Sequence, residues 1–455
     1  MLVVMPLRIA RRWAELAMGA ILVAGCGQGP PSASDAAAQG DGRDASTAGN
    51  DGASFGGGAR PARVILIDWD GFDPSYLDLA DLPNLDRLID RGSLSIARGT
   101  YKTISNPSRA SIVTGAYPEA HRNVAYVYDE DSDRVIAQSR FLAAETLTQA
   151  LARQGKTTAS VQWYMVQNHG NTFGDPEHLY VQPGGDCVER INVAIDILHR
   201  RPVESGGELV TVPRVPDFMA VYCSEIDGLG HQEGPNSPNM IPLIEETDYQ
   251  LGRLIDATEA LGLFDDTAFL FVTDHGMTAY SEDIQPRLLQ VIRDLGFSPE
   301  RPGGGSTPAP QTDVILTAIP RSANVFLRGE AATEEARAEI LAAIAAMPEI
   351  ERIVEPDELR SLRAAVELEG EFVIEPKEPY GFAITDLPAG SERGGHSALS
   401  EISGPLVLSG RGVCRQTAPD GPELVDIAPT VAALLGVAPP ADAQGRALDE
   451  ALCLD

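Results

Sequence analysis

Short apolar runs recur along the chain, and turn signals follow them. Five of these runs predict buried strands, at residues 63–68, 157–162, 217–222, 268–273 and 405–409. Helical patterns lie between them, at residues 83–91, 108–113, 241–261 and 424–435. Strands that alternate with helices favour a mostly parallel sheet with helices on both faces. We therefore expect an α/β fold, a three-layer sandwich around that sheet.

Two stretches interrupt this alternation. Residues 124–215 contain polar, irregular segments such as QNHGNTFGDPEH. Residues 280–390 contain a strand-helix-strand pattern, with a helix at 332–347 and an extended piece at 353–354. We expect the second stretch to form a small α/β cap insertion in one folded domain that spans residues 61–455.

The first 60 residues have the composition of an export signal and a linker. Arginines precede the apolar run LAMGAILVAG, which is too short for a comfortable membrane span and predicts a signal peptide at 1–25. The segment LVAGC resembles a bacterial lipobox, which implies a lipid on Cys26 and anchoring in the cell envelope, periplasmic or surface-facing. An ordinary secretory signal is the alternative. Residues 26–60 are rich in Gly, Ala, Ser and Asp, so we expect a flexible tether.

The formal net charge of −31 limits the partners of the folded part. Such an acidic body repels nucleic-acid backbones and anionic lipid, so we expect no binding of nucleic-acid polymers. A small phosphate substrate stays compatible, because bound cations would dominate the field around it.

Four cysteines remain if Cys26 carries lipid, and they could pair in an oxidising compartment. Cys414 and Cys453 lie near turn signals in the C-terminal portion and are the preferred pair. Cys223 ends an apolar strand and could instead be a buried thiol. No CxxC spacing indicates a cysteine metal site.

Acidic and histidine residues stand where predicted strands stop. They are Asp70 in IDWDGF, Asp227 and His231 in EIDGLGH, Asp274 and His275 in TDHGM, and His396 in GGHS. Functional residues gather at the carboxyl ends of parallel strands, and carboxylate oxygen with imidazole nitrogen suits zinc. The glycines of EIDGLGH predict a tight backbone bend that lets Asp227 and His231 converge.

A hydroxyl group stands before a predicted helix in TISNPSRAS. Ser105 could be the N-cap of that helix. It could also be a nucleophile, and both roles can hold at once, since a helix N-terminus also favours a phosphate group.

Together these segments resemble the alkaline phosphatase superfamily, and within it the type I phosphodiesterase/nucleotide pyrophosphatase branch. The matching pieces are DGF at 70–72, LPNLDRL at 82–88, VTGAYPEAH at 113–121, EIDGLGH at 225–231, VTDHGM at 272–277, GGHS at 394–397 and VDIAPTVAALLG at 425–436. Alignment through VTG puts Ser105 at the nucleophile position.

The resemblance implies a site with two zinc ions and the superfamily's fold. One zinc would be held by Asp227, His231 and His396. The other would be held by Asp70, Asp274, His275 and the nucleophile Ser105. The implied activity is hydrolysis of small phosphate esters, phosphodiesters or nucleotide pyrophosphates, through a phosphoserine. A phosphomonoesterase is the alternative.

Two departures from the family pattern bear on the substrate. SNPSR also resembles the sulfatase signature. In that interpretation Ser105 would be converted to formylglycine, and Arg109 is the residue that matches the signature. The sulfatase resemblance, however, would imply a site with one calcium ion and an Asp-Asn pair, whereas this chain has an Asp-His pair. Many relatives carry an asparagine after the PEAHG-type segment to hold a phosphate oxygen. Here Asn123 comes earlier, so Asn123 and Arg109 are the candidate substrate contacts.

Overall fold

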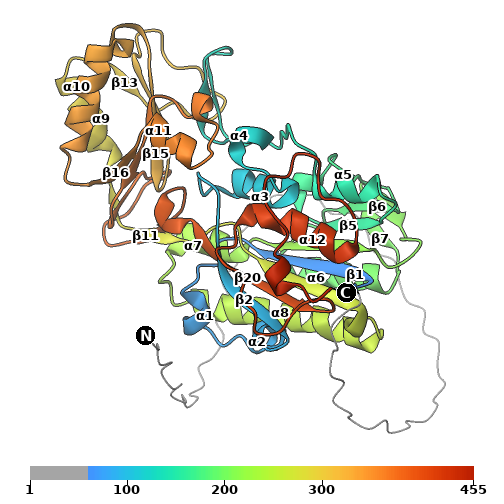
Figure 1. Ribbon diagram of the computed structural model, residues 1–455. Helices are drawn as coiled ribbons and strands as arrows, with labels where there is room; N and C mark the ends of the chain where they lie inside the picture. The colour runs from blue at the N-terminus through green and yellow to red at the C-terminus, as the bar shows by residue number, and fades with distance from the viewer. Residues whose placement is uncertain (1–59, 455) are drawn as a thin grey trace, which may run out of the picture. The chain divides into compact units, whose positions relative to one another are not determined.

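A seven-stranded sheet forms the centre of the larger part of the molecule, with the strands in the order β2, β20, β10, β1, β9, β5, β6 (Figure 1). The computed structural model describes residues 60–454. Five neighbouring strands run parallel, namely β10 (Thr267–Val272), β1 (Arg63–Trp69), β9 (Phe218–Cys223), β5 (Thr158–Val161) and β6 (His178–Val181). At one edge β20 (Ser403–Gly410) runs antiparallel to β10 and to β2 (Gly92–Arg98). The sheet is therefore mostly parallel.

Side chains of the central strand β1 pack into two separate hydrophobic cores, one on each face of the sheet. Ile65 and Ile67 pack in the core that includes α2 (Pro83–Ile89), α6 (Cys187–Leu198) and α8 (Met240–Ala260). Val64 and Leu66 pack in the core that includes α3 (Ser105–Thr114), α5 (Leu147–Ala152) and α12 (Ile427–Leu435). A strand that is buried on both faces reads as a continuous apolar run. The predicted α/β class with helices on both faces is confirmed.

The predicted element positions agree with the structure except in residues 124–215, and one predicted strand differs in its direction. Each of the five predicted strands is present, but β20 is antiparallel. Within 124–215 only the strand at 157–162 is predicted from the sequence, yet this stretch also supplies β6 to the central sheet and α6 to one face. Helix α6 begins at a capping box, in which the Asp186 side chain accepts a bond from Val188 N. This capping box lies within a polar segment, so the sequence pattern did not predict the start of α6.

The predicted insertion at 280–390 contains a sheet of its own. Its five strands are β13 (Pro299–Glu300), β14 (Val314–Ile319), β15 (Ser322–Leu327), β17 (Phe372–Pro376) and β16 (Ile350–Val354), in that order. Helices α9 (Gln285–Asp294) and α10 (Glu334–Ala345) bury Leu288 and Ile340 against it in a distinct core. The predicted helix at 332–347 and the extended piece at 353–354 are present as α10 and β16.

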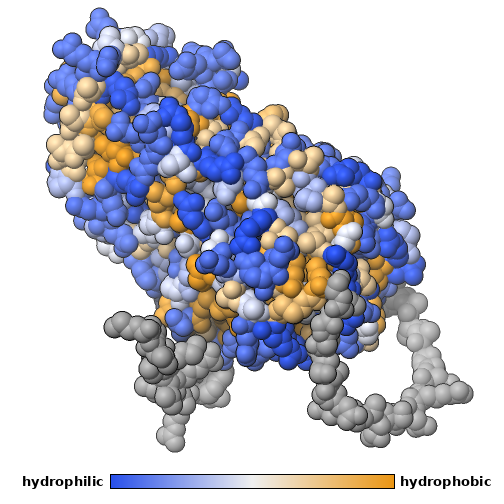
Figure 2. Space-filling model, viewed as in Figure 1, coloured by the Kyte–Doolittle hydropathy of each residue, from blue (hydrophilic) through white to orange (hydrophobic). Residues whose placement is uncertain are grey.

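Short elements complete the fold. The two-stranded pairs are β3 (Val127–Asp129) with β4 (Arg134–Ile136), β7 (Val203–Ser205) with β8 (Glu208–Val210), β11 (Thr278–Tyr280) with β19 (Arg393–Gly395), and β12 (Glu282–Asp283) with β18 (Tyr380–Gly381). The remaining α-helices of residues 60–454 are α1 (Tyr76–Leu79), α4 (Pro118–His121), α7 (Glu225–Glu233) and α11 (Pro356–Ser361). Hydrophilic residues cover much of the face shown in Figure 2, which agrees with the acidic composition.

A buried glutamate joins β17 to the segment that follows His396. Glu375 Oε1 accepts a bond from Leu399 N at 3.1 Å, and only 5 % of the residue is exposed. Burial, reinforced by the nearby Glu401 carboxylate, raises the pKa of Glu375 to about 7. Between pH 4.5 and 7 the folded protein therefore holds a proton that the unfolded chain has released, so stability falls as pH rises through this interval.

The substitution Glu375→Gln should remove this pH dependence. We expect the difference in unfolding free energy, variant minus wild type, to be about 1–3 kcal/mol more positive at pH 8 than at pH 4.5. Urea unfolding at the two pH values measures it. Glu351→Gln, on an exposed position of β16, is the matched control and should show no such shift. An equal shift in both variants would contradict the assignment.

Two disulfides are present within residues 60–454. The predicted pair Cys414–Cys453 is confirmed. The interpretation of Cys223 as a free buried thiol is wrong, since Cys223 at the end of β9 is bonded to Cys187 at the start of α6. Burial alone could not reveal this partner, because the two cysteines meet only when α6 packs on the sheet. Cys26, the predicted signal peptide and almost all of the predicted tether lie outside the described residues.

Among residues 60–454, no helix combines the length and the apolar character needed to span a membrane.

Candidate active site

The predicted site residues meet at one edge of the central sheet. Asp70 follows β1 directly, and Asp274 and His275 follow β10 after one residue. Asp227 and His231 lie on α7, which begins just beyond β9. Strands β10, β1 and β9 are parallel neighbours, so their carboxyl ends deliver these side chains to the same place.

Asp227 and His231 converge by a different route from the one predicted. The glycines of EIDGLGH do not make a tight bend, because the segment forms α7. Residues four apart lie on one helix face, and Asp227 Oδ1 lies 3.3 Å from His231 Nε2. Gly230 has a packing role instead, since a Cβ there would lie 2.8 Å from Met277 Cε.

Ser105 is the first residue of α3, and its hydroxyl faces the histidine cluster. The N-cap position belongs to Ile104, which has extended backbone angles, and no side chain caps this helix. The Ser105 Oγ lies 3.3 Å from His275 Nε2. The alternative role of Ser105 as an N-cap is therefore wrong, and its hydroxyl is available to the site.

The three histidines present the same nitrogen to the site. In each ring Nδ1 lies against a backbone carbonyl: His231 with Gly394 at 3.0 Å, His275 with Gly276 at 3.0 Å and His396 with Thr103 at 2.6 Å. A carbonyl only accepts hydrogen bonds, so Nδ1 carries the proton and the Nε2 lone pair is free to bind a metal.

Two sets of donor atoms fit divalent cations. Within the described residues, Asp227, His231 and His396 form one set and Asp70, Asp227 and His275 form another, each with its donor atoms within 4.8 Å of one another. His231 Nε2 faces His396 Nε2 at 3.1 Å, and two lone pairs at that distance repel unless a cation binds them. Asp70 Oδ1 and Asp227 Oδ1 are buried and accept no hydrogen bond. A bound cation would satisfy both oxygens.

Burial sets the protonation of these candidate ligands. It lowers the pKa of His275 to about 4 and the pKa of His396 well below its usual value. The rings of His275 and His396 stack with centroids 3.6 Å apart, which also disfavours charging both. Burial and the nearby Asp70 carboxylate raise the pKa of Asp227 to about 7. Neutral imidazoles are the form that binds metal, and a cation would restore the charged form of Asp227.

Asp274 stands beside the two sets and is tied to the protein. Its Oδ1 accepts a bond from Gly71 N at 3.2 Å, and its Oδ2 accepts one from Arg109 Nη1 at 2.8 Å. The same Oδ2 lies 3.2 Å from His275 Nε2. The structure therefore brings all seven predicted ligands together, with Asp274 the most engaged by protein donors.

Arg109, predicted to contact substrate, lies behind the site. It is fully buried, with Nε and Nη2 donating to the two oxygens of Asp68 at 2.7 and 3.0 Å. Its Nη1 lies 3.2 Å from Asp70 Oδ2 and also serves Asp274. Three buried carboxylates thus surround one guanidinium, and Arg109 orients Asp70 and Asp274 rather than lining the cavity.

Replacing Arg109 with methionine should leave these carboxylates uncompensated. Removing one partner from a buried ion pair costs about 3–5 kcal/mol, so we expect a drop of that size in the unfolding free energy of Arg109→Met, measured by urea unfolding. Arg134→Met, at an exposed position of β4, is the control and should change stability by less than about 0.5 kcal/mol. Equal effects of the two substitutions would contradict the assigned role.

Asn123, the other predicted substrate contact, is also fully buried. Its Nδ2 donates to the backbone carbonyls of Ser139 and Phe141, at 3.1 and 2.8 Å. Asn123 therefore holds the segment that forms one side of the cavity and does not line the cavity itself.

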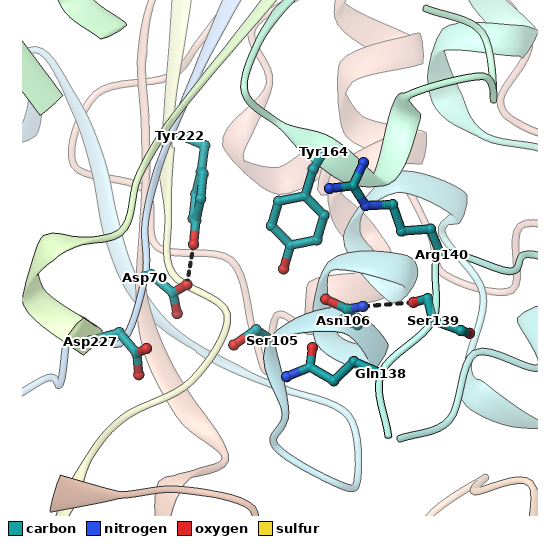
Figure 3. A pocket seen from close by; sticks show the side chains of 9 residues that line it. All are labelled: Asp70, Ser105, Asn106, Gln138, Ser139, Arg140, Tyr164, Tyr222 and Asp227. Atoms are coloured by element: carbon teal, nitrogen blue, oxygen red, sulfur yellow. Dashed lines mark hydrogen bonds between the residues drawn. The ribbon is translucent and has the colours of Figure 1, made fainter. Parts of the chain in front are cut away.

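A cavity of about 470 Å³ opens over Ser105, Asp70 and Asp227. Figure 3 shows the two carboxylates next to the serine hydroxyl, with the rings of Tyr222 and Tyr164 along the wall. The Tyr222 hydroxyl donates a hydrogen bond to Asp70 Oδ2. The other carboxylate oxygen, Oδ1, is therefore free to bind a metal ion. The lining residues that the sequence did not predict are Asn106, Gln138, Ser139, Arg140, Tyr164 and Tyr222. Tyr222 is part of an apolar strand, and Asn106 stands in SNPSR, where only Ser105 and Arg109 were assigned roles. The other four residues lie in segments without a recognised motif.

The fold is shared with solved structures of nucleotide-cleaving ectoenzymes. The chain is similar to human ectonucleotide pyrophosphatase/phosphodiesterase 5, with a TM-score of 0.64 at 18 % identity over 82 % of this chain and 95 % of that one. It is equally similar to an inactive form of the murine protein solved in complex with AMP, with a TM-score of 0.64.

Sequence comparison defines the family. The type I phosphodiesterase / nucleotide pyrophosphatase family matches residues 64–388, and the chain belongs to this family. It is 29 % identical to the bis(5'-adenosyl)-triphosphatase enpp4 of Xenopus laevis over 231 residues, 49 % of this chain and 48 % of the relative. It is 26 % identical to ectonucleotide pyrophosphatase/phosphodiesterase family member 3 of Mus musculus, over 51 % of this chain and 27 % of the relative. The chain thus spans about half or less of the length of these relatives.

Proposed function

We propose that this protein is a metal-dependent hydrolase that cleaves phosphodiester or nucleotide pyrophosphate bonds through a covalent phosphoserine at Ser105. The observation that carries the proposal is the position of Ser105 Oγ, 3.3 Å from His275 Nε2 and at the N-terminus of α3. The names of the relatives, a bis(5'-adenosyl)-triphosphatase and nucleotide pyrophosphatases, support a small nucleotide-type substrate.

Two zinc ions are the proposed cofactors. Asp227, His231 and His396 would hold one, and Asp70, Asp274, His275 and Ser105 would hold the other. When bound, the ions would lower the pKa of the serine hydroxyl and offset charge on the phosphoryl oxygens.

The chain's own residues position the reaction. The N-terminus of α3 directs its positive dipole end toward the phosphoryl group. The hydroxyl of Tyr222 fixes Asp70, and Arg109 fixes Asp70 and Asp274 from behind. Ser105 would attack the phosphorus, forming a serine–phosphorus ester while the bond to the leaving oxygen breaks. Overall, the serine proton is transferred to the leaving oxygen. A water molecule then hydrolyses the serine ester and releases the phosphoryl group.

Three aryl esters test the proposal. We expect zinc-loaded protein to cleave an aryl nucleotide diester faster than an aryl phosphomonoester, and an aryl sulfate least. Sulfate as the preferred substrate, together with formylglycine at position 105, would replace the proposal with a sulfatase. Preference for the monoester would make the protein a phosphomonoesterase.

We also propose that the protein works outside the cytoplasm. The disulfides Cys187–Cys223 and Cys414–Cys453 support an oxidising compartment. Lipid anchoring in the bacterial envelope through Cys26 stays a prediction.

A further inference from the structure

The lining of the cavity has two chemically different ends. Its carboxylates, Asp70 and Asp227, are both proposed metal ligands. Away from them the lining consists of amides, hydroxyls and one guanidinium, that of Arg140. The chain has 66 acidic and 35 basic residues. A cationic end of the cavity that is lined by no carboxylate is therefore unusual for this chain. It offers hydrogen-bond donors to an anion beyond the phosphorus that Ser105 would attack.

Arg140 is held in place without an acidic partner. Its Nη1 donates to Gln167 Oε1, and its guanidinium carbon lies 5.2 Å from the centroid of the Tyr164 ring. Among residues 60–454, no ion pair joins Arg140 to a carboxylate. A guanidinium has five donors. The bond to Gln167 uses one of them and the contact with the Tyr180 hydroxyl uses another, so three donors stay free. An arginine with this freedom suits bidentate binding of a phosphate.

Buried amides hold the backbone on both sides of Arg140, and one of these amides belongs to α3, the helix that begins with Ser105. Asn106, next to Ser105, donates from Nδ2 to the Ser139 carbonyl at 2.6 Å. Asn123 donates to the same carbonyl and to that of Phe141. Asn106 and Asn123 are 7 % and 0 % exposed. Two buried amides therefore fix the position of Arg140 relative to Ser105, as a substrate subsite requires.

We infer that Arg140 binds a second anionic group of the substrate, so that the site takes compounds with two linked phosphoryl groups in preference to simple diesters. This inference rests on the proposed function. The metal ligands and Ser105 would act on one phosphoryl group, and Arg140 would bind the next. A diester with a neutral alcohol leaves this guanidinium unused.

Two substrates that share a nucleoside test the inference. Thymidine 5'-(4-nitrophenyl phosphate) has one charged phosphoryl group, and dithymidine diphosphate has two. For Arg140→Ala we expect the ratio of kcat/KM, diphosphate over diester, to fall about 10- to 100-fold, the worth of a charge-assisted hydrogen bond. Arg140→Lys keeps the charge and should recover part of the ratio. Arg134→Ala removes an exposed arginine from the same segment and should leave both rates unchanged.

A binding measurement decides the inference independently of turnover. Zinc-loaded Ser105→Ala protein, with and without Arg140→Ala, is titrated with thymidine mono- and diphosphate in a calorimeter. We expect Arg140→Ala to weaken the diphosphate about 10-fold more than the monophosphate. Equal weakening of the two ligands, or none, would overturn the inference. If the wild type cleaves neither substrate, the proposed function fails, and this titration still tests Arg140.

Discussion

Replacing Ser105 with alanine is expected to abolish turnover while the fold stays intact. Deleting a covalent nucleophile lowers the rate by about four to six orders of magnitude. The hydroxyl makes no cap bond, because Ile104 is the N-cap residue of α3. The unfolding free energy should therefore change by less than about 1 kcal/mol. Steady-state assays and urea unfolding measure the two effects.

Variants at and near position 105 separate the nucleophile from a structural role. Ser108→Ala removes a buried hydroxyl without a hydrogen-bond partner from the same helix, and it should leave turnover near the wild-type rate. Ser105→Thr keeps a hydroxyl and should retain activity. Mass spectrometry of quenched reactions should find a phosphoryl group on Ser105 of the wild type. An active Ser105→Ala variant would show that another group attacks the phosphorus.

Replacing Asp227 with asparagine is expected to have opposite effects on activity and on the metal-free fold. The Oδ1 of Asp227 lies 3.3 Å from His231 Nε2 and 3.6 Å from His396 Nε2, so the substitution removes a charged donor from that set. We expect zinc content to fall and turnover to drop by about 10³-fold or more. In chelator the variant should be more stable than the wild type by about 1–2 kcal/mol, because a buried carboxylate beside Asp70 is neutralised.

Elemental analysis and urea unfolding, with and without zinc, measure these effects. Glu233→Gln, on an exposed position of α7, is the matched control and should keep zinc, turnover and the wild-type response to chelator. Zinc should stabilise the wild type more than Asp227→Asn. A variant that is less stable than the wild type in chelator would show that Asp227 has a structural partner and not a metal.

Local sequence was sufficient to predict that most of the candidate metal ligands lie together. A continuous apolar run such as the one before Asp70 predicts a strand buried on both faces, and that places it in a parallel sheet. Parallel strands present their carboxyl ends at one edge, so the residues after β1 and β10 had to meet. The prediction needed no knowledge of any contact between Asp70 and Asp274, which lie far apart in the chain.

Tertiary packing alone decided which polar side chains face the cavity. Arg109 and Arg140 both belong to segments near Ser105, and only the first stood in a recognisable motif. Yet Arg109 lies one helical turn after Ser105 and faces buried Asp68, whereas Arg140 reaches the cavity because Asn106 and Asn123 hold its segment. The apolar runs in the sequence predict where strands end, because the burial of neighbouring apolar side chains drives strand formation. The partner of a polar side chain depends on segments far away in sequence, whose positions exist only in the folded chain.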